Sequence, residues 1–151
     1  MNKDIIPELI IALLVLLFAY AGTSKLLDMH GFIAGMKQQP FPAWLNKVLA
    51  VVLPGAEVAI AVLLVFKRTR PAALYAYVLL MLCFTGYTAL VVFDFFSHRP
   101  CGCGGIISGL SWNWHFVLNI IFLILACIAI RLHTQSKLLR DQGASQKPVT
   151  E

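Results

Sequence analysis

Two cysteines separated by a single residue are the part of this sequence best suited to chemistry. Cys101 and Cys103 lie in the segment Pro-Cys-Gly-Cys-Gly-Gly at residues 100–105. A disulfide needs Cα atoms about 4.4–6.8 Å apart, a separation that cysteines two positions apart meet only with some strain. Strained, exposed disulfides are easily reduced and tend to be catalytic. The pair therefore predicts reversible thiol–disulfide chemistry.

Charged neighbours of this pair can tune its reactivity. Arg99 lies two positions before Cys101, and a positive charge there favours the nucleophilic thiolate. His115 lies near the start of the last apolar run, where a helix N-terminus adds positive potential to the same loop. Lys25 lies near the end of the first run and either extends to the interface or turns inward, where it would favour the thiolate or hold an anionic partner. Asp28, three positions later, is spaced to pair with Lys25.

Membrane-spanning helices are the elements that must position these residues. Hydrophobic residues make up 60% of the 151 residues and charged residues 13%, against about 45–50% and about 25% in soluble proteins. About 20 apolar residues suffice to span a bilayer. Four runs qualify and predict an all-α, integral membrane four-helix transmembrane bundle: residues 5–27, 47–66, 71–96 and 112–132.

Basic residues predict the orientation of this bundle. With both termini in the cytoplasm, eight of the 12 Lys and Arg residues face inward, which agrees with the positive-inside rule. The densest group is the short turn at residues 67–70. The cysteine loop then lies on the periplasmic side of a bacterial inner membrane, where disulfides persist. Contacts with anionic lipid headgroups account for the net charge of +5, so we expect no nucleic-acid partner.

Several polar residues lie inside the predicted spans. Glu57 is the most costly of them, because a carboxyl group in a span normally faces the bundle interior. It can pair across helices as a structural group, or it can carry a proton or bind a quinone head group. Asn119 lies one turn after His115 and is spaced to hydrogen-bond it. Cys83 and Cys127 are expected to be small, buried hydrophobic residues.

The remaining segments do not span. Residues 29–45 are too polar, and Pro40 and Pro42 interrupt them, so we expect an interfacial segment that packs against the bundle. Residues 1–132 then form one membrane domain. Residues 133–151 are predicted to be a polar, disordered cytoplasmic tail.

Several of these stretches together resemble the MauE family of methylamine utilisation, within the broader DoxX-like membrane proteins. The resemblance covers about residues 5–132 and is carried by Tyr-Ala-Gly-Thr-Ser-Lys-Leu-Leu-Asp at residues 20–28, Phe32, Pro54 with Glu57, the basic turn at residues 67–70, and the Cys-Gly-Cys-Gly-Gly loop before Ser111, Trp112 and Asn119. It implies a four-helix membrane protein that helps a disulfide-rich dehydrogenase subunit to mature, often beside a thioredoxin-like partner. It also implies that Cys101 and Cys103 are the redox pair, with Lys25, Asp28 and Glu57 as motif positions.

Three functions remain open at this point. In the first, which we favour, Cys101 and Cys103 exchange disulfides with a periplasmic thioredoxin-like or disulfide-containing protein, and electrons pass to or from a membrane quinone. Such relays usually have a second outward cysteine pair, which a partner would have to supply. In the second, the protein is a non-enzymatic assembly subunit with a structural loop disulfide. In the third, His98, Cys101, Cys103 and His115 bind zinc or copper, although the one-residue cysteine spacing disfavours a rigid tetrahedral site.

Overall fold

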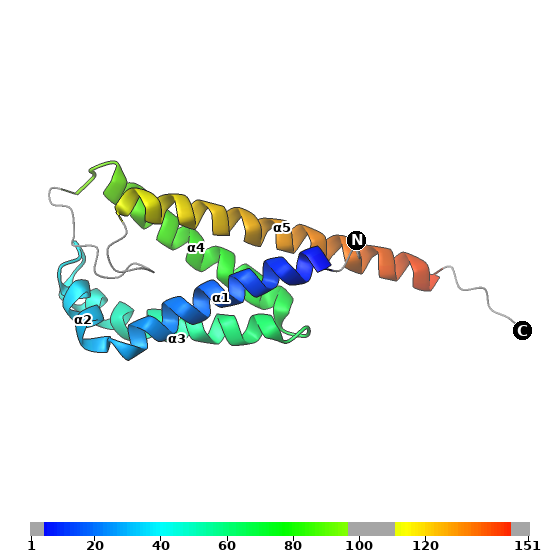
Figure 1. The fold of residues 1–151 in the computed structure, drawn as a ribbon, viewed down its shortest axis with the longest axis horizontal. Coiled ribbons are helices and arrows are strands. Elements are labelled where there is room, and N and C mark those ends of the chain that lie inside the picture. Colours follow the sequence, from blue (N-terminus) through cyan, green and yellow to red (C-terminus); the bar gives the residue numbers. More distant parts are fainter. Residues whose placement is uncertain (1–4, 97–110, 146–151) are drawn as a thin grey trace, which may run out of the picture.

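The computed structural model describes residues 5–96 and 111–145, and the regular structure in these ranges is entirely helical (Figure 1). The helices are α1 (Ile5–Leu27), α2 (Met29–Lys37), α3 (Ala43–Val65), α4 (Arg70–Val92) and α5 (Trp112–Ser145). All except the short α2 are long and apolar enough to cross a membrane. The predicted all-α class with four spans is confirmed, and the chain is a multi-pass membrane protein.

Proline and backbone geometry set the ends of the long helices. Pro42 is the N-cap of α3, so this helix begins before the predicted residue 47. Pro71 lies in the first turn of α4, where the missing N–H of proline costs no hydrogen bond. α4 ends at Val92 rather than at residue 96, because Asp94 adopts a left-handed conformation with φ of 54° that does not continue a helix.

The segment between α1 and α3 forms a short helix at one end of the bundle. Asp28 begins α2, since its Oδ1 accepts a hydrogen bond from the amide of Gly31 at 3.0 Å. Phe32 and Met36 of α2 are buried and belong to the same apolar cluster as Ala50 of α3. The prediction of a non-spanning segment that packs against the bundle is confirmed.

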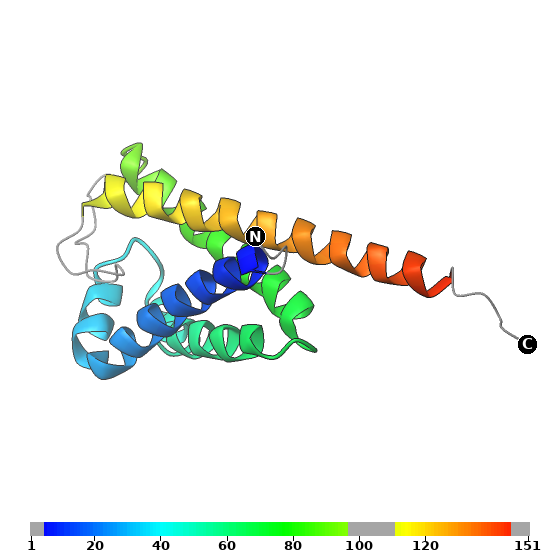
Figure 2. The same ribbon diagram turned by 45° about the vertical axis from the view of Figure 1, so that its right-hand side comes forward.

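The four long helices pack as two pairs. α1 packs mainly on α3 and α4 mainly on α5, while α3 with α4 and α1 with α5 make smaller contacts. Phe18 of α1 and Tyr77 of α4 stack in the centre with their ring centroids 3.9 Å apart. The pairs lie close together near the N-terminus of α1 and diverge toward the end that carries α2 (Figures 1 and 2). This divergence leaves room for a site at that end.

The outer faces of the helices are apolar, as contact with lipid requires. Leu16, Val51 and Leu79 are among the large hydrophobic side chains that point outward. Cys83 and Cys127 are also exposed, Cys83 in the wall of the pocket described below, so the prediction that they are buried was wrong. A helix surrounded by lipid can be apolar on every face, and the apolar character of a cysteine therefore says little about which face it occupies.

α5 continues past the predicted domain boundary at residue 132. It is 34 residues long, its candidate span covers Trp112–Ser136, and it projects beyond the other helices (Figure 1). Residues 133–145 contain no proline, and most of their polar residues have good helix propensity, so an established helix propagates through them. This part of the predicted tail is helical.

Candidate binding pocket and buried ion pair

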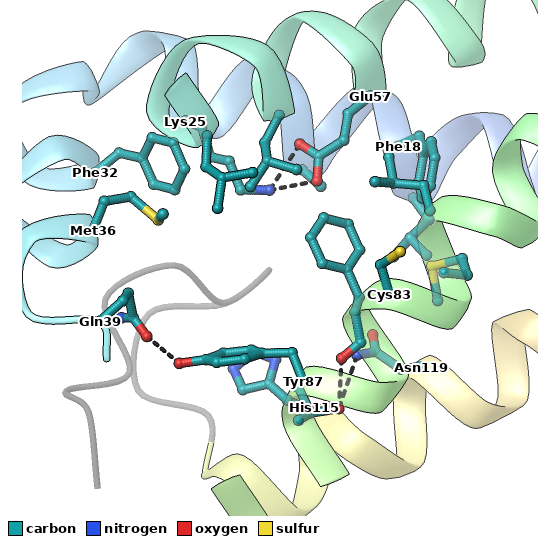
Figure 3. Close-up of a pocket in the computed structure, with 18 of the residues that line it drawn as sticks. Phe18, Lys25, Phe32, Met36, Gln39, Glu57, Cys83, Tyr87, His115 and Asn119 are labelled. Carbon is teal, nitrogen blue, oxygen red and sulfur yellow. Dashed lines mark hydrogen bonds and ion pairs between the residues drawn. The ribbon is translucent and has the colours of Figure 1, made fainter. Parts of the chain in front are cut away.

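A pocket of about 240 Å³ lies between the diverging helix pairs, and all five helices contribute to its wall (Figure 3). Most of the wall is apolar or aromatic. The aromatic side chains are Phe18, Phe32, Phe41, Phe84, Tyr87 and Trp112. The other polar side chains are Lys25, Gln39, Glu57, Thr88, His115 and Asn119. A mostly apolar wall with a few polar groups is typical of small-molecule sites.

A buried ion pair links α1 to α3 in this wall. Lys25 Nζ lies 2.6 Å from Glu57 Oε1 and 2.7 Å from Glu57 Oε2 (Figure 3). The side chain of Lys25 is 10% exposed and that of Glu57 is 1% exposed. The rings of Phe32 and Phe84 flank the ammonium, with centroids 5.9 and 5.8 Å from Nζ. Glu57 thus pairs across helices, which is one of the alternatives that the sequence left open.

Lys25 itself adopts neither of two conformations that the sequence favoured. It does not extend outward to the interface, and it does not pair with Asp28. Asp28 instead caps α2, because the chain turns there and directs the carboxylate toward the amide of Gly31. With Asp28 engaged in the cap, the buried carboxylate of Glu57 is the partner of the ammonium.

A close approach of α1 and α3 positions this pair. A Cβ atom added at Gly22 would lie 2.7 Å from Val58 Cγ2 and 3.1 Å from the carbonyl oxygen of Pro54. Only glycine therefore fits at this position without displacing a helix. Gly22 is one turn before Lys25, and Pro54 is one turn before Glu57. The two charged side chains meet where the helix backbones are close.

Tyr87 of α4 organises the opposite wall. Its hydroxyl donates a hydrogen bond to Gln39 Oε1 in the turn after α2 (Figure 3). Its ring centroid lies 6.2 Å from that of Phe96 and 6.1 Å from that of Trp112. Phe96 and Trp112 come from the two ends of the chain segment that joins α4 to α5, so both ends of that segment lie beside the pocket.

Two polar side chains of α5 complete the wall. His115 is 5% exposed, and its Nε2 has no hydrogen-bond partner among the described residues. The hydrogen bond expected between Asn119 and His115 does not form. Asn119 Nδ2 instead donates to Thr88 Oγ1 of α4 at 3.4 Å, because α4 is the main packing partner of α5. His115 thus remains a buried imidazole with unused hydrogen-bonding capacity.

The structure brings some of the predicted site residues together. Lys25, Glu57 and His115 all line the pocket. The described residues do not include Arg99, His98, Cys101 or Cys103. The last three are also ligands of the alternative metal site, so only His115 of that predicted site is described. The sequence did not single out Gln39 or Tyr87 as pocket residues. Tyr87 did carry a signal, because a hydroxyl inside an apolar span usually finds a partner.

These features define a multi-pass helical membrane protein whose interior pocket contains a lysine–glutamate ion pair. The chain belongs to the family of methylamine utilisation protein MauE, whose model matches residues 3–132. It is 32% identical over 124 residues to the methylamine utilization protein MauE of Paracoccus denitrificans, which covers 80% of this chain and 64% of that protein. The chain therefore spans less than two thirds of the length of this relative. No solved structure matches it significantly. The family predicted from the sequence is confirmed.

Proposed function

We propose that this protein acts in methylamine utilisation, by exchanging disulfides with an extracytoplasmic partner through Cys101 and Cys103. Membership of the MauE family supports the pathway, and the Cys-Gly-Cys spacing supports the chemistry. One structural observation carries the proposal. The two helix ends that flank the cysteine segment border a pocket with a buried ion pair, a histidine and a tyrosine.

Covalent geometry links the cysteines to this end of the bundle. Cys101 is five residues after Phe96, and an extended chain of that length reaches at most about 18 Å. The ring of Phe96 contacts Tyr87 in the pocket wall. A chain of this length keeps the thiols within that reach of the end of the bundle where the pocket lies. We propose that this end faces the periplasm and that both termini face the cytoplasm.

The exchange balances without any further reactant. A thiolate of the partner attacks the Cys101–Cys103 disulfide and forms a mixed disulfide, releasing one cysteine thiolate. The second partner thiolate then attacks the mixed disulfide. The partner leaves with a disulfide, and Cys101 and Cys103 remain as a dithiol. A thioredoxin-like protein or a disulfide-containing dehydrogenase subunit has the chemistry to be this partner.

Thiol labelling in cells tests the proposal. Cells that express the protein are treated with a membrane-impermeant maleimide, before and after mild reductant, in a Cys83→Ala/Cys127→Ala background. This background matters because both of these cysteines are exposed on their helices. We expect reversible labelling from outside the cell, and a partner trapped as a mixed disulfide when either Cys101→Ser or Cys103→Ser is introduced.

The alternative functions give different outcomes. A pair that never opens under mild reductant would indicate a structural disulfide in an assembly subunit. Labelling that bound metal blocks and a chelator restores would indicate a metal site that includes His98 and His115. Labelling only after the membrane is permeabilised would place the cysteines in the cytoplasm. Each of these outcomes would overturn the proposal.

A further inference from the structure

We propose that the interior pocket binds the head group of a membrane quinone, with Lys25 as a hydrogen-bond donor to one of its carbonyl oxygens. The proposal rests on the shape, charge and hydrogen-bonding capacity of the pocket, and it depends on the proposed function only for the source of electrons.

The size and walls of the pocket suit an aromatic ring. A cavity of roughly 150 Å³ holds benzene, so a volume of about 240 Å³ holds a substituted quinone ring. Phe18, Phe32, Phe84, Tyr87 and Trp112 line the space and offer ring faces and edges for stacking. The four long helices around the pocket are long and apolar enough to cross a membrane. A lipid-soluble ligand is therefore present in the same phase as the pocket.

The charge of the pocket favours a neutral ligand. The ammonium of Lys25 and the carboxylate of Glu57 are in direct contact and cancel each other. An anionic or cationic ligand would bring an unbalanced charge into a site of low dielectric constant, which is strongly unfavourable. A quinone is uncharged and still accepts hydrogen bonds through two carbonyl oxygens, so it matches this balance.

Two groups in the wall can bond those oxygens. The ammonium of Lys25 has three protons, and its two contacts with Glu57 leave one for a ligand. The side chain of Lys25 keeps 10% of its surface exposed, whereas that of Glu57 keeps 1%. His115 lines the pocket from α5, on the other helix pair, and is the second group with unused bonding capacity. The ring would lie between them.

Binding of a quinone completes the electron balance of the proposed function. When Cys101 and Cys103 return from dithiol to disulfide, they release two electrons and two protons. A quinone accepts both electrons and both protons and becomes a quinol. A chain with a single proposed redox pair then needs no second pair of its own to pass electrons to the membrane.

Tryptophan fluorescence tests the binding directly. Trp44 and Trp114 are 66% and 65% exposed, so a Trp44→Phe/Trp114→Phe protein in lipid nanodiscs retains Trp112 in the pocket wall as its fluorophore. We expect a decyl-tailed benzoquinone to quench this fluorescence saturably. Decanol carries only the tail and should not displace the quinone. In a Lys25→Met/Glu57→Gln variant, which keeps the volume and removes both charges, binding should weaken about tenfold.

Matched histidine variants control for general damage to α5. His115 and His133 both lie in this helix, and each has an Nε2 without a partner among the described residues, but only His115 lines the pocket. We expect His115→Phe to weaken quinone binding and His133→Phe to leave it unchanged, with helicity by circular dichroism equal in the two variants. Equal effects of the two substitutions would overturn the site.

Two further results would also overturn the proposal, and both come from protein with an intact pocket. The first is quenching that rises linearly with the concentration of the decyl-tailed benzoquinone and never saturates. The second is full recovery of the Trp112 fluorescence when decanol is added in excess, which would show that the tail alone competes for the site. If no quinone binding is found but the thiols open reversibly and trap a partner, the quinone site is wrong and the proposed function stands. Saturable binding with thiols that never open would remove the proposed function and leave the quinone site.

Discussion

Two ion pairs tie α1 to other helices at opposite ends of the bundle, and they differ in their surroundings. Lys25 and Glu57 lie in the pocket between α1 and α3, with side chains 10% and 1% exposed. Arg70 Nη1 and Glu8 Oε1 lie 2.8 Å apart between α4 and α1, with side chains 14% and 52% exposed. The contact distances are similar, so burial is the main difference between the pairs.

This difference in burial indicates different roles for the two ion pairs. Exposed ion pairs contribute about 0–1 kcal/mol, because water screens both charges. A buried pair must offset the desolvation of both ions, and well-packed apolar residues of the same volume often stabilise a protein more. Apolar residues could therefore hold α1 to α3. The presence of charges at this point, in the wall of a pocket, therefore fits the proposed ligand site.

The largest effect should come from breaking the buried pair. Glu57→Leu leaves the Lys25 ammonium buried without a partner, and we expect the free energy of unfolding to fall by about 3–5 kcal/mol. Denaturation of the detergent-solubilised protein, followed by circular dichroism, measures this change. The double variant Lys25→Met/Glu57→Leu removes the unpaired charge and should recover most of the loss. A double variant as unstable as the single one would show that the pair is needed for the packing itself.

The close helix approach beside that pair gives the next effect. A Cβ atom at Gly22 would meet Val58 and Pro54, so Gly22→Ala forces α1 and α3 apart and should cost about 1–3 kcal/mol. The same substitution at Gly55 or Gly86 meets nothing within 4 Å and should stabilise its helix by about 0.5–1 kcal/mol. Opposite signs in the same unfolding assay would show that the pocket end is held by backbone contact. A neutral Gly22→Ala would contradict this geometry.

Glu57 and the apolar runs also show what the sequence could predict. The apolar runs fixed the four spans, because length and composition alone decide whether a helix can cross a bilayer. Glu57 stood out because a carboxyl group in a span is costly, and pairing across helices was one of the roles that the sequence allowed for it. The partner of Glu57 was not predicted. Lys25 could pair with either Asp28 or Glu57, and which of the two it contacts depends on how α1 ends. The turn that begins α2 engages Asp28 in a cap and leaves Lys25 to α3.

The pocket could not be predicted in the same way. It exists because two helix pairs diverge, and divergence depends on packing between helices far apart in the sequence. Tyr87 and Gln39 are 48 positions apart and meet only after α2 folds back against α3. The exposure of Cys83 and Cys127 could not be predicted either, because it depends on the rotation of helices that are apolar on most faces. The Cys101–Cys103 prediction lies outside the described residues and is tested by thiol labelling.

A smaller effect should follow from the contact across the pocket. Tyr87→Phe removes the hydroxyl that donates to Gln39 but keeps the ring against Phe41 and Trp112. Hydrogen bonds between membrane helices average about 0.6 kcal/mol, and we expect a loss of that size in the free energy of unfolding. A double-mutant cycle with Gln39→Leu isolates the coupling. Additive effects of the two substitutions would show that this bond contributes nothing to holding the turn after α2.

The exposed pair should give the smallest effect and the sharpest contrast. Glu8→Gln keeps the size of the side chain and removes its charge, and Arg70 retains a second bond, in which Nε donates to the carbonyl oxygen of Leu64 at 3.1 Å. We expect a loss of about 0.2–0.5 kcal/mol in low salt. This loss should vanish in about 1 M salt, where the screening length falls to about 3 Å. The cost of Glu57→Leu should persist in the same salt series, because the side chains of Lys25 and Glu57 are buried and buried pairs are screened much less. Equal salt sensitivity at the two positions would mean that solvent reaches both pairs, and the burial of Lys25 and Glu57 would then no longer support a ligand site.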